Sequence, residues 1–286
     1  MFDFLRRLVP GMGSGQPLVA VLRLSGPIGV NFGPGRPSLS LTQVARDLEN
    51  AFRLRGVKTV ALAVNSPGGS PVQSNLIYSR IRALAEEYEV PVVTFTEDVA
   101  ASGGYWIALA GDEVYADPNS IVGSIGVISA GFGFPELLKK IGVERRLYTS
   151  GDNKGMLDSF SDEKATDVKR LKELQKRIHD SFKAIVRDRR GEKLSGAESK
   201  IFSGEFWTGA QALSLGLVDG LGDLRTVMRA RFGDKVRLKV VGRRGRRFGI
   251  TFRSRREAPA FTDLADWPDR LLGALEVRAM WSRFGL

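Results

Sequence analysis

The sequence predicts a layered α/β fold with a largely parallel β-sheet, followed by a basic C-terminal extension. Three runs of buried-type residues, over 18–24, 57–64 and 90–96, have the composition of core strands. Helical patterns separate them, and strands that alternate with helices favour a parallel sheet. The 286 residues are 43% apolar and 26% charged, which is typical of a globular protein long enough for one large domain.

Each element has local support in the sequence. The strand over 18–24 stops at a Ser-Gly-Pro turn, and apolar residues at helical spacing then predict a helix over 40–54. The strand over 57–64 is followed by a helix over 71–89, and the third strand, over 90–96, by the loop that carries Ser102. The later predicted elements are a helical run over 105–110, a short strand over 113–116, a glycine-punctuated segment over 122–128, a helix over 136–141, a strand over 143–149, a long amphipathic helix over 163–190, and a helix and strand over 207–219.

The elements divide the chain into three parts. Residues 1–16 contain a glycine-rich stretch and predict a flexible N-terminus. Residues 17–232 hold the alternating strands and helices and form the predicted main domain. Residues 233–286 form the basic C-terminal extension, with a strand-like stretch over 236–241 and an amphipathic helix over 271–284. Packing on the main domain or on a neighbouring subunit, and contact with a membrane, both stay open for that helix.

Charge is concentrated near the C-terminus. The formal net charge is +11, and the run from Lys239 to Arg256 has eight Lys or Arg and no acid. Such a run is usually a solvated face; the functional alternatives are anionic lipid headgroups and nucleic acid. We favour lipid over nucleic acid, because no zinc-finger or RNA-binding signature accompanies the charge.

Composition also bounds the chemistry and the location. The absence of cysteine excludes disulfides and thiol nucleophiles, and a single histidine, His179, argues against a zinc site. We expect no metal and no cofactor. No run approaches the length of a membrane span and no signal peptide is recognisable. We therefore expect a cytoplasmic protein that contacts the inner membrane face peripherally.

Two glycine pairs follow neighbouring predicted strands. Asn65-Ser-Pro-Gly-Gly-Ser contains Gly68 and Gly69, and Ala-Ala-Ser-Gly-Gly contains Ser102 and Gly103. The carboxyl ends of parallel strands meet at one edge of a sheet, where sites form. Amides from the two glycine pairs could there make an oxyanion hole beside the serine. The competing interpretation is two ordinary strand-to-helix turns.

A serine nucleophile needs a base. His179 lies in a highly charged helical segment and is predicted to be a surface residue. A lysine with a lowered pKa can take that role. The residues alone leave Lys154, Lys139 and Lys140 as candidates for the base. The last two are on a predicted helix and look solvated.

The chain resembles the S49 peptidase family, which includes signal peptide peptidase A and SohB and has a ClpP/crotonase-like fold. The motifs that carry the resemblance are Asn65-Ser-Pro-Gly-Gly-Ser, Ala101-Ser-Gly-Gly-Tyr, Gly123-Ser-Ile-Gly-Val, Ser150-Gly-Asp-Asn-Lys and Trp207-Thr-Gly-Ala-Gln-Ala with Gly-Leu-Val-Asp after it. They stand in family order over residues 17–225.

The resemblance implies a role for each site residue. Ser102 would be the nucleophile, Lys154 the general base, and Ser124 the residue that orients the lysine amine. The oxyanion hole would come from amides at Gly68, Gly69 and Gly103. The resemblance also implies a homo-oligomer, because dyad residues in the family can come from adjacent repeats or subunits.

Two features depart from the family pattern. Its bacterial members are generally membrane-anchored, and this chain has no predicted span. Its lysine loop continues Gly-Met-Leu-Asp-Ser-Phe in place of the usual Pro-Phe ending.

The leading hypothesis is a serine endopeptidase with a Ser-Lys dyad. It would cleave hydrophobic peptides, such as remnant signal peptides or membrane-protein fragments, through an acyl-enzyme, and its activity would rise with pH as the lysine deprotonates. One alternative is a crotonase-like acyl-CoA enzyme, which shares the paired oxyanion amides but needs neither the serine nor the late lysine. Another is a non-catalytic scaffold at a membrane surface that uses the basic run and the C-terminal helix.

Overall fold

The computed structural model describes residues 15–29, 38–242 and 267–286, with residues 267–273 as backbone only. The predicted N-terminal segment, residues 1–16, lies almost wholly outside the described residues, and so does most of the basic run. Lipid contact by that run therefore stays a prediction. No helix among the described residues is both long and apolar enough to cross a membrane.

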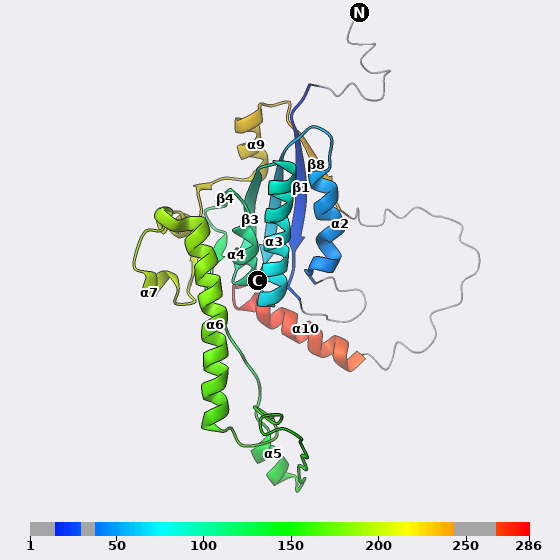
Figure 1. The fold of residues 1–286 in the computed structure, drawn as a ribbon, viewed down its shortest axis with the longest axis vertical. Coiled ribbons are helices and arrows are strands. Elements are labelled where there is room, and N and C mark those ends of the chain that lie inside the picture. Colours follow the sequence, from blue (N-terminus) through cyan, green and yellow to red (C-terminus); the bar gives the residue numbers. More distant parts are fainter. Residues whose placement is uncertain (1–14, 30–37, 243–266) are drawn as a thin grey trace, which may run out of the picture.

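A mostly parallel sheet forms the centre of the molecule (Figure 1). Its main path runs β6-β5-β3-β2-β1-β8; off this path, β4 pairs with β3, and β7 pairs with β4. Among the strand pairs of the described residues, only β5–β6 is antiparallel. The strands are β1 (Leu18–Ser25), β2 (Val57–Ser66), β3 (Val92–Ala101), β4 (Glu113–Ala116), β5 (Ile121–Gly123), β6 (Phe206–Thr208), β7 (Gly220–Leu221) and β8 (Arg237–Val241). The predicted fold class, a layered α/β fold of the ClpP/crotonase type, is confirmed.

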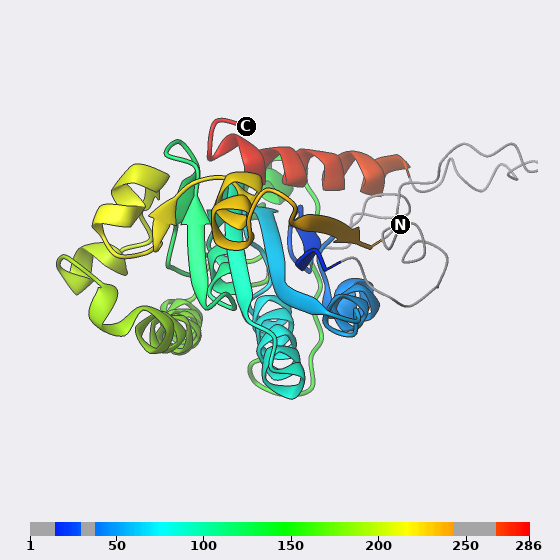
Figure 2. The same ribbon diagram turned by 90° about the horizontal axis from the view of Figure 1, so that it is seen from above.

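Helices cover both faces of the sheet (Figure 2). One face packs against α2, α3, α4 and α6, where the largest apolar core lies. The other face packs against α9, whose buried Met228 belongs to the same apolar cluster as Val21 and Phe95 of the sheet. The helices are α2 (Leu41–Phe52), α3 (Pro71–Tyr88), α4 (Gly103–Ala108), α5 (Pro135–Lys140), α6 (Ala165–Arg190), α7 (Glu198–Ile201), α8 (Gly209–Ser214), α9 (Leu224–Phe232) and α10 (Trp267–Ser282), with a 3₁₀ turn at Gly191–Lys193.

The C-terminal region adds to the same body. β8 lies in the predicted extension, yet it pairs in parallel with β1 over Leu18–Leu22. Farther on, Phe284 is buried against Val99 and Ala101 of β3. The end of the chain therefore supports the strand that leads to Ser102.

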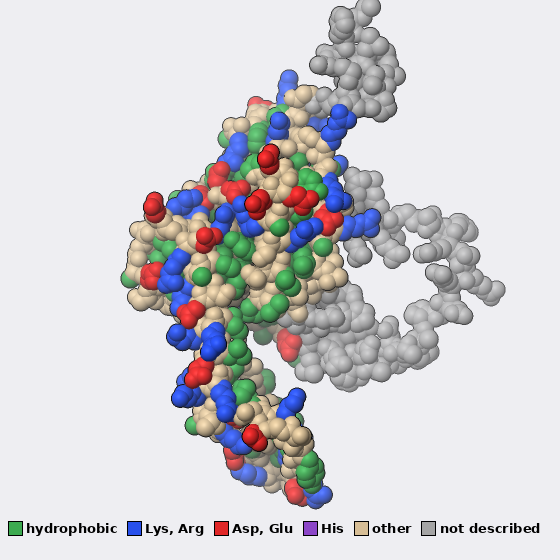
Figure 3. All heavy atoms as spheres, viewed as in Figure 1, with side chains coloured by type: hydrophobic (Ala, Val, Ile, Leu, Met, Phe, Trp, Pro, Cys, Tyr) green, Lys and Arg blue, Asp and Glu red, His purple; other side chains and the backbone are tan. Residues whose placement is uncertain are grey.

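An arm projects from this body, and we define it as residues 126–178 (Figure 1). It contains α5, the turns that follow, and the N-terminal half of α6. No residue of α5 is buried, and Phe132 and Tyr148 are 81% and 89% exposed. The space-filling view shows apolar and basic side chains mixed along the arm (Figure 3). The arm thus lacks an apolar core of the kind that holds the body together.

Two predictions fail on the arm. The predicted strand over 143–149 is wrong: these residues are exposed and have no strand conformation. Their residue types favour a strand, but they pair with no other strand among the described residues. The long predicted helix is confirmed, but its apolar stripe is buried only in the C-terminal half, at Phe182 and Val186. Leu174, in the N-terminal half, is 55% exposed because that half extends beyond the body.

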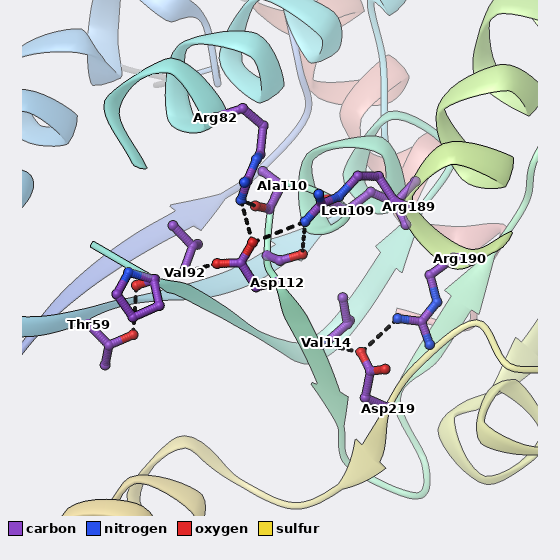
Figure 4. Close-up of polar contacts among 12 residues, drawn as sticks. Thr59, Arg82, Val92, Leu109, Ala110, Asp112, Val114, Arg189, Arg190 and Asp219 are labelled. Atoms are coloured by element: carbon purple, nitrogen blue, oxygen red, sulfur yellow. Dashed lines mark hydrogen bonds and ion pairs between the residues drawn. The ribbon is translucent and has the colours of Figure 1, made fainter. Parts of the chain in front are cut away.

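Two arginines cap the C-terminal end of α4, the short helix that follows Ser102 (Figure 4). Arg82 donates to the carbonyl oxygen of Ala110 at 3.0 Å, and Arg189 donates to that of Leu109 at 3.0 Å. Both also bind the Asp112 carboxylate. A helix end leaves carbonyls unpaired, and cations there are favourable. This network fixes α4 against α3 and α6.

A buried ion pair fixes the end of α6. Arg190 donates to the Asp219 carboxylate at 2.6 Å and to the carbonyl oxygen of Gly216 at 2.8 Å. The Arg190 side chain is 2% exposed. Asp219 also accepts from the amide of Val114 at 2.8 Å, which ties this pair to β4 (Figure 4).

Candidate active site

Ser102 stands at a strained turn between β3 and α4. Its φ of 53° and ψ of −121° lie where serine is rarely found. Such backbone strain costs on the order of 1–3 kcal/mol and is concentrated at functional sites. The amide of Ser102 donates to the carbonyl oxygen of Gly123 at 2.8 Å, which anchors the turn to β5. The half-buried Ser102 hydroxyl has no hydrogen-bonding side chain within residues 15–29, 38–242 and 267–286.

The first glycine pair packs directly on this serine. A Cβ added to Gly68 would lie 2.8 Å from the Cβ of Ser102 and 3.0 Å from the amide nitrogen of Gly103. Gly68 also has a φ of 101°, which favours glycine. Close approach and backbone conformation therefore both require glycine here. The two predicted strand ends do meet.

The amides of Gly69 and Gly103 are both free to bind an oxyanion. The carbonyl of Gly68 accepts from the amide of Ile28 at 2.9 Å, so the amide of Gly69, on the opposite side of the same trans peptide, points away from Ile28. It lies 3.4 Å from where a Cβ of Gly103 would be. Gly103 is the first residue of α4, where helix amides have no helical partner. Within the described part of the chain, neither amide has an acceptor.

The Gly68 amide, in contrast, already has an acceptor. It donates to Ser66 Oγ at 3.2 Å, and Ser66 Oγ donates in turn to the carbonyl oxygen of Gly26 at 2.7 Å. Ser66 is fully buried. We therefore take Gly69 and Gly103, and not Gly68, as the oxyanion donors of the proposed mechanism. Ser66 stands inside the first glycine motif, but no local pattern in the sequence indicates its bond to the Gly68 amide.

Ser124 lies beside Ser102 on the neighbouring strand end. Ala101 is in register with Gly123, so the residues that follow each of them are close. Ser124 is buried, has a φ of 52°, and donates its amide to the carbonyl oxygen of Glu205 at 2.6 Å. The backbone of Ser124 is thus held close to Ser102.

Within one chain, Lys154 does not lie near Ser102 and Ser124. It lies in a turn of the arm, where its amide donates to the carbonyl oxygen of Gly151 at 3.1 Å. Its side chain is exposed, and no ion pair or hydrogen bond with a described residue involves it. The arm carries it away from the strand ends (Figure 1). Its role as base stays a prediction, and a single chain leaves the proposed dyad unassembled.

His179 is not the surface residue that the sequence predicted. It is half-buried, and its Nε2 lies 3.0 Å from the carbonyl oxygen of Ile125, one residue beyond Ser124. Burial lowers the pKa of His179, and the charge of Lys183 lowers it further. No sequence signal pointed to this contact, because residues 54 positions apart form it.

Replacing Gly69 by Ala is expected to lower peptide-hydrolysis activity by about 10²-fold. The new Cβ would overlap the backbone of Ile28, and the φ of 145° disfavours any side chain. The amide would therefore be displaced from the oxyanion position. The measurement is kcat with a peptide substrate. Gly56→Ala is the matched control, because its φ is also positive but nothing lies within 4 Å of its Cβ position.

Comparison with known proteins gives the chain a family and a fold. Residues 85–236 match the model of peptidase family S49. The chain is 34% identical to a putative signal peptide peptidase SppA of Enterococcus faecium, over 64% of this chain and 51% of that protein. A solved structure of a membrane-bound stomatin-specific protease, a lysine-to-alanine mutant in complex with a substrate peptide, has a similar fold, with a TM-score of 0.51. It is 18% identical and covers 92% of this chain and 99% of its own length.

A further relative has an unexpected name. The chain is 54% identical, over 99% of its length, to a Brucella abortus protein named Na(+)/H(+) antiporter NhaA. This chain spans only 39% of that protein. The family match covers more than half of the chain, and the chain belongs to the S49 peptidase family.

Proposed function

We propose that this chain is a serine endopeptidase that uses Ser102 and Lys154 as a dyad. The observation that carries the proposal is the strained Ser102 turn beside two unpaired amides, those of Gly69 and Gly103. A nucleophile with two convergent donors is suited to attack on a carbonyl and to stabilisation of the resulting oxyanion. Membership of the S49 family supports a peptidase over an acyl-CoA enzyme.

The proposed reaction proceeds in two halves. Ser102 Oγ attacks the scissile carbonyl carbon while the neutral amine of Lys154 takes the hydroxyl proton. The oxyanion binds the amides of Gly69 and Gly103. Collapse of the tetrahedral intermediate breaks the C–N bond, and the protonated lysine gives its proton to the leaving amine. Water, deprotonated by Lys154, then hydrolyses the acyl-enzyme and restores Ser102.

Lys154 is proposed to come from a neighbouring copy of the chain. Of the eighteen described large apolar residues that are exposed, ten lie on the arm or at its root, from Ile128 to Leu174. In a monomer these side chains would all be in contact with water, and exposed apolar side chains that gather in one region mark interaction surfaces. A second copy that covers the arm would bury these residues and could bring the arm's Lys154 to the partner's Ser102. The exposed part of the apolar stripe of α6 would then be buried in the interface between two copies.

The proposed substrates are hydrophobic peptides, such as remnant signal peptides and membrane-protein fragments. Support comes from the names of the similar proteins, which include a signal peptide peptidase and a membrane-bound protease specific for stomatin. Activity is expected to rise with pH as the lysine amine becomes neutral.

The test is to trap the acyl-enzyme. A hydrophobic peptide ester is mixed with the full chain, the reaction is quenched, and mass spectrometry locates the added acyl group. The expected result is acylation on the peptide that contains Ser102 and none in Ser102→Ala. Hydrolysis at an undiminished rate by Ser102→Ala would contradict the proposal.

A further inference from the structure

The single histidine joins the two chain segments at the root of the arm. The chain leaves the body just after Ile125 and returns to it along α6, on which His179 lies. The His179 Nε2 to Ile125 carbonyl contact, at 3.0 Å, bridges these outgoing and returning segments. Since a carbonyl oxygen can only accept, Nε2 must carry the proton. With its pKa lowered by burial, the ring is neutral at pH 7, and Nδ1 is the unprotonated nitrogen.

The outgoing segment is held from three sides at this point. The amide of Ser124 donates to Glu205, and the carbonyl of Gly123 accepts from Ser102. A Cβ on Gly126 would lie 3.2 Å from the Cα of Gly204, so the backbones pack closely there as well. Two kinds of contact link this segment to α6: Ile125 is buried in the apolar core that also holds Phe182 and Val186, and the carbonyl of Ile125 accepts the hydrogen bond from His179. Beyond Ile125, Ile128 is already 69% exposed.

The side chains of the returning segment, α6, change from exposed to buried around His179. Phe182, one turn after His179, is buried and stacks on Trp106 of α4 with ring centroids 4.7 Å apart. Leu174, more than one turn before His179, is exposed. His179 therefore lies where α6 stops packing on the body and becomes part of the arm. The His179 contact thus lies where the arm, which carries Lys154, leaves the body.

We propose that His179 is a positioning residue for the peptidase reaction: its Nε2–H bond to Ile125 fixes the root of the arm and thereby the placement of Lys154. The role in catalysis rests on the proposed function, whereas the role in fixing the arm does not. His179 takes no proton from Ser102 in this account. It acts through the backbone at Ile125, beside Ser124.

The first experiment reads the histidine directly. Because the chain has one histidine, labelling with ¹⁵N-histidine gives a single imidazole signal set from the full chain. The expected result at pH 7 is a neutral ring with the proton fixed on Nε2. A protonated Nδ1, or rapid averaging between the two tautomers, would overturn the proposal.

The second experiment measures the arm. The chain lacks cysteine, so spin labels at Lys140→Cys on the arm and Glu86→Cys on α3 report one distance, both residues being exposed. Labelled chains are diluted with unlabelled chains to isolate intramolecular pairs. His179→Leu, which lacks the donor, is expected to broaden or shift the distance distribution. His179→Gln, which keeps an N–H near the Nε2 position, is expected to retain it.

The same variants are assayed for peptide hydrolysis. His179→Leu is expected to lose kcat by roughly tenfold, the scale of one hydrogen bond, with KM unchanged, and His179→Gln to recover most of it. An unchanged distance distribution in His179→Leu overturns the proposal whatever the activity. A shifted distribution with full kcat overturns the catalytic role. If the parent chain hydrolyses no peptide, the proposed function fails, and the distance measurement still decides whether His179 fixes the arm.

Discussion

Ser102→Ala and Lys154→Ala are each expected to lower kcat for peptide hydrolysis by about 10⁴-fold or more, because a nucleophile and its base act as one unit. The fold should survive both changes. Lys154 is exposed, and its side chain has no hydrogen bond or ion pair with a described residue. The measurement is steady-state hydrolysis of a hydrophobic peptide, alongside thermal unfolding of each variant.

The matched control for the lysine is Lys140→Ala. Lys140 is also exposed on the arm, at the end of α5, and no ion pair among the described residues involves it. It should keep full activity. If Lys154→Ala lost no more activity than Lys140→Ala, a different group would have to be the base.

The largest expected loss of stability comes from Asp219→Ala. Arg190 would remain buried with one carbonyl partner, that of Gly216, and its Nη2 already lacks a partner. Breaking a buried ion pair by removing one member costs about 3–5 kcal/mol of unfolding free energy. Chemical denaturation of the full chain measures this loss. Asp180→Ala is the control, since Asp180 pairs with lysines on the exposed side of α6 and should change nothing measurable.

The Arg190–Asp219 ion pair also predicts how the free energy of unfolding depends on pH. Burial alone would raise the pKa of Asp219, but hydrogen bonds from Arg190 and Lys193 outweigh it and hold the pKa below its ordinary 3.8. A lowered folded-state pKa gives stability that is complete above the unfolded pKa and is lost as pH falls through the folded one. Wild type should therefore lose stability more steeply than Asp219→Ala below about pH 4. Parallel pH profiles would contradict this assignment.

The sequence was sufficient to predict the sheet and the strand ends. Runs of buried-type residues predicted β1, β2 and β3. Each glycine motif was expected directly after a strand, and the structure has Gly68 just after β2 and Ser102 just after β3. These features are local: a hydrophobic run sets the strand, and a glycine sets the turn that follows it. The family resemblance is confirmed by the S49 match.

The arm could not be predicted in the same way. The periodicity of α6 shows that one face is apolar but not which surface covers it, so Leu174 looked buried although one chain leaves it exposed. The contact of His179 with Ile125 joins distant residues and has no local pattern. The parallel pairing of β8 with β1 is equally long-range, so the C-terminal region looked like an extension.

The measurement that tests the central claim most directly mixes the two inactive variants. Ser102→Ala and Lys154→Ala are unfolded together, refolded as an equal mixture, and assayed for peptide hydrolysis. If Lys154 acts on a neighbouring copy, random assembly pairs an intact serine with an intact lysine in about one quarter of sites, and activity returns to that level. If the mixture stays as inactive as either variant alone, although it assembles to the same size as wild type, the shared site is contradicted.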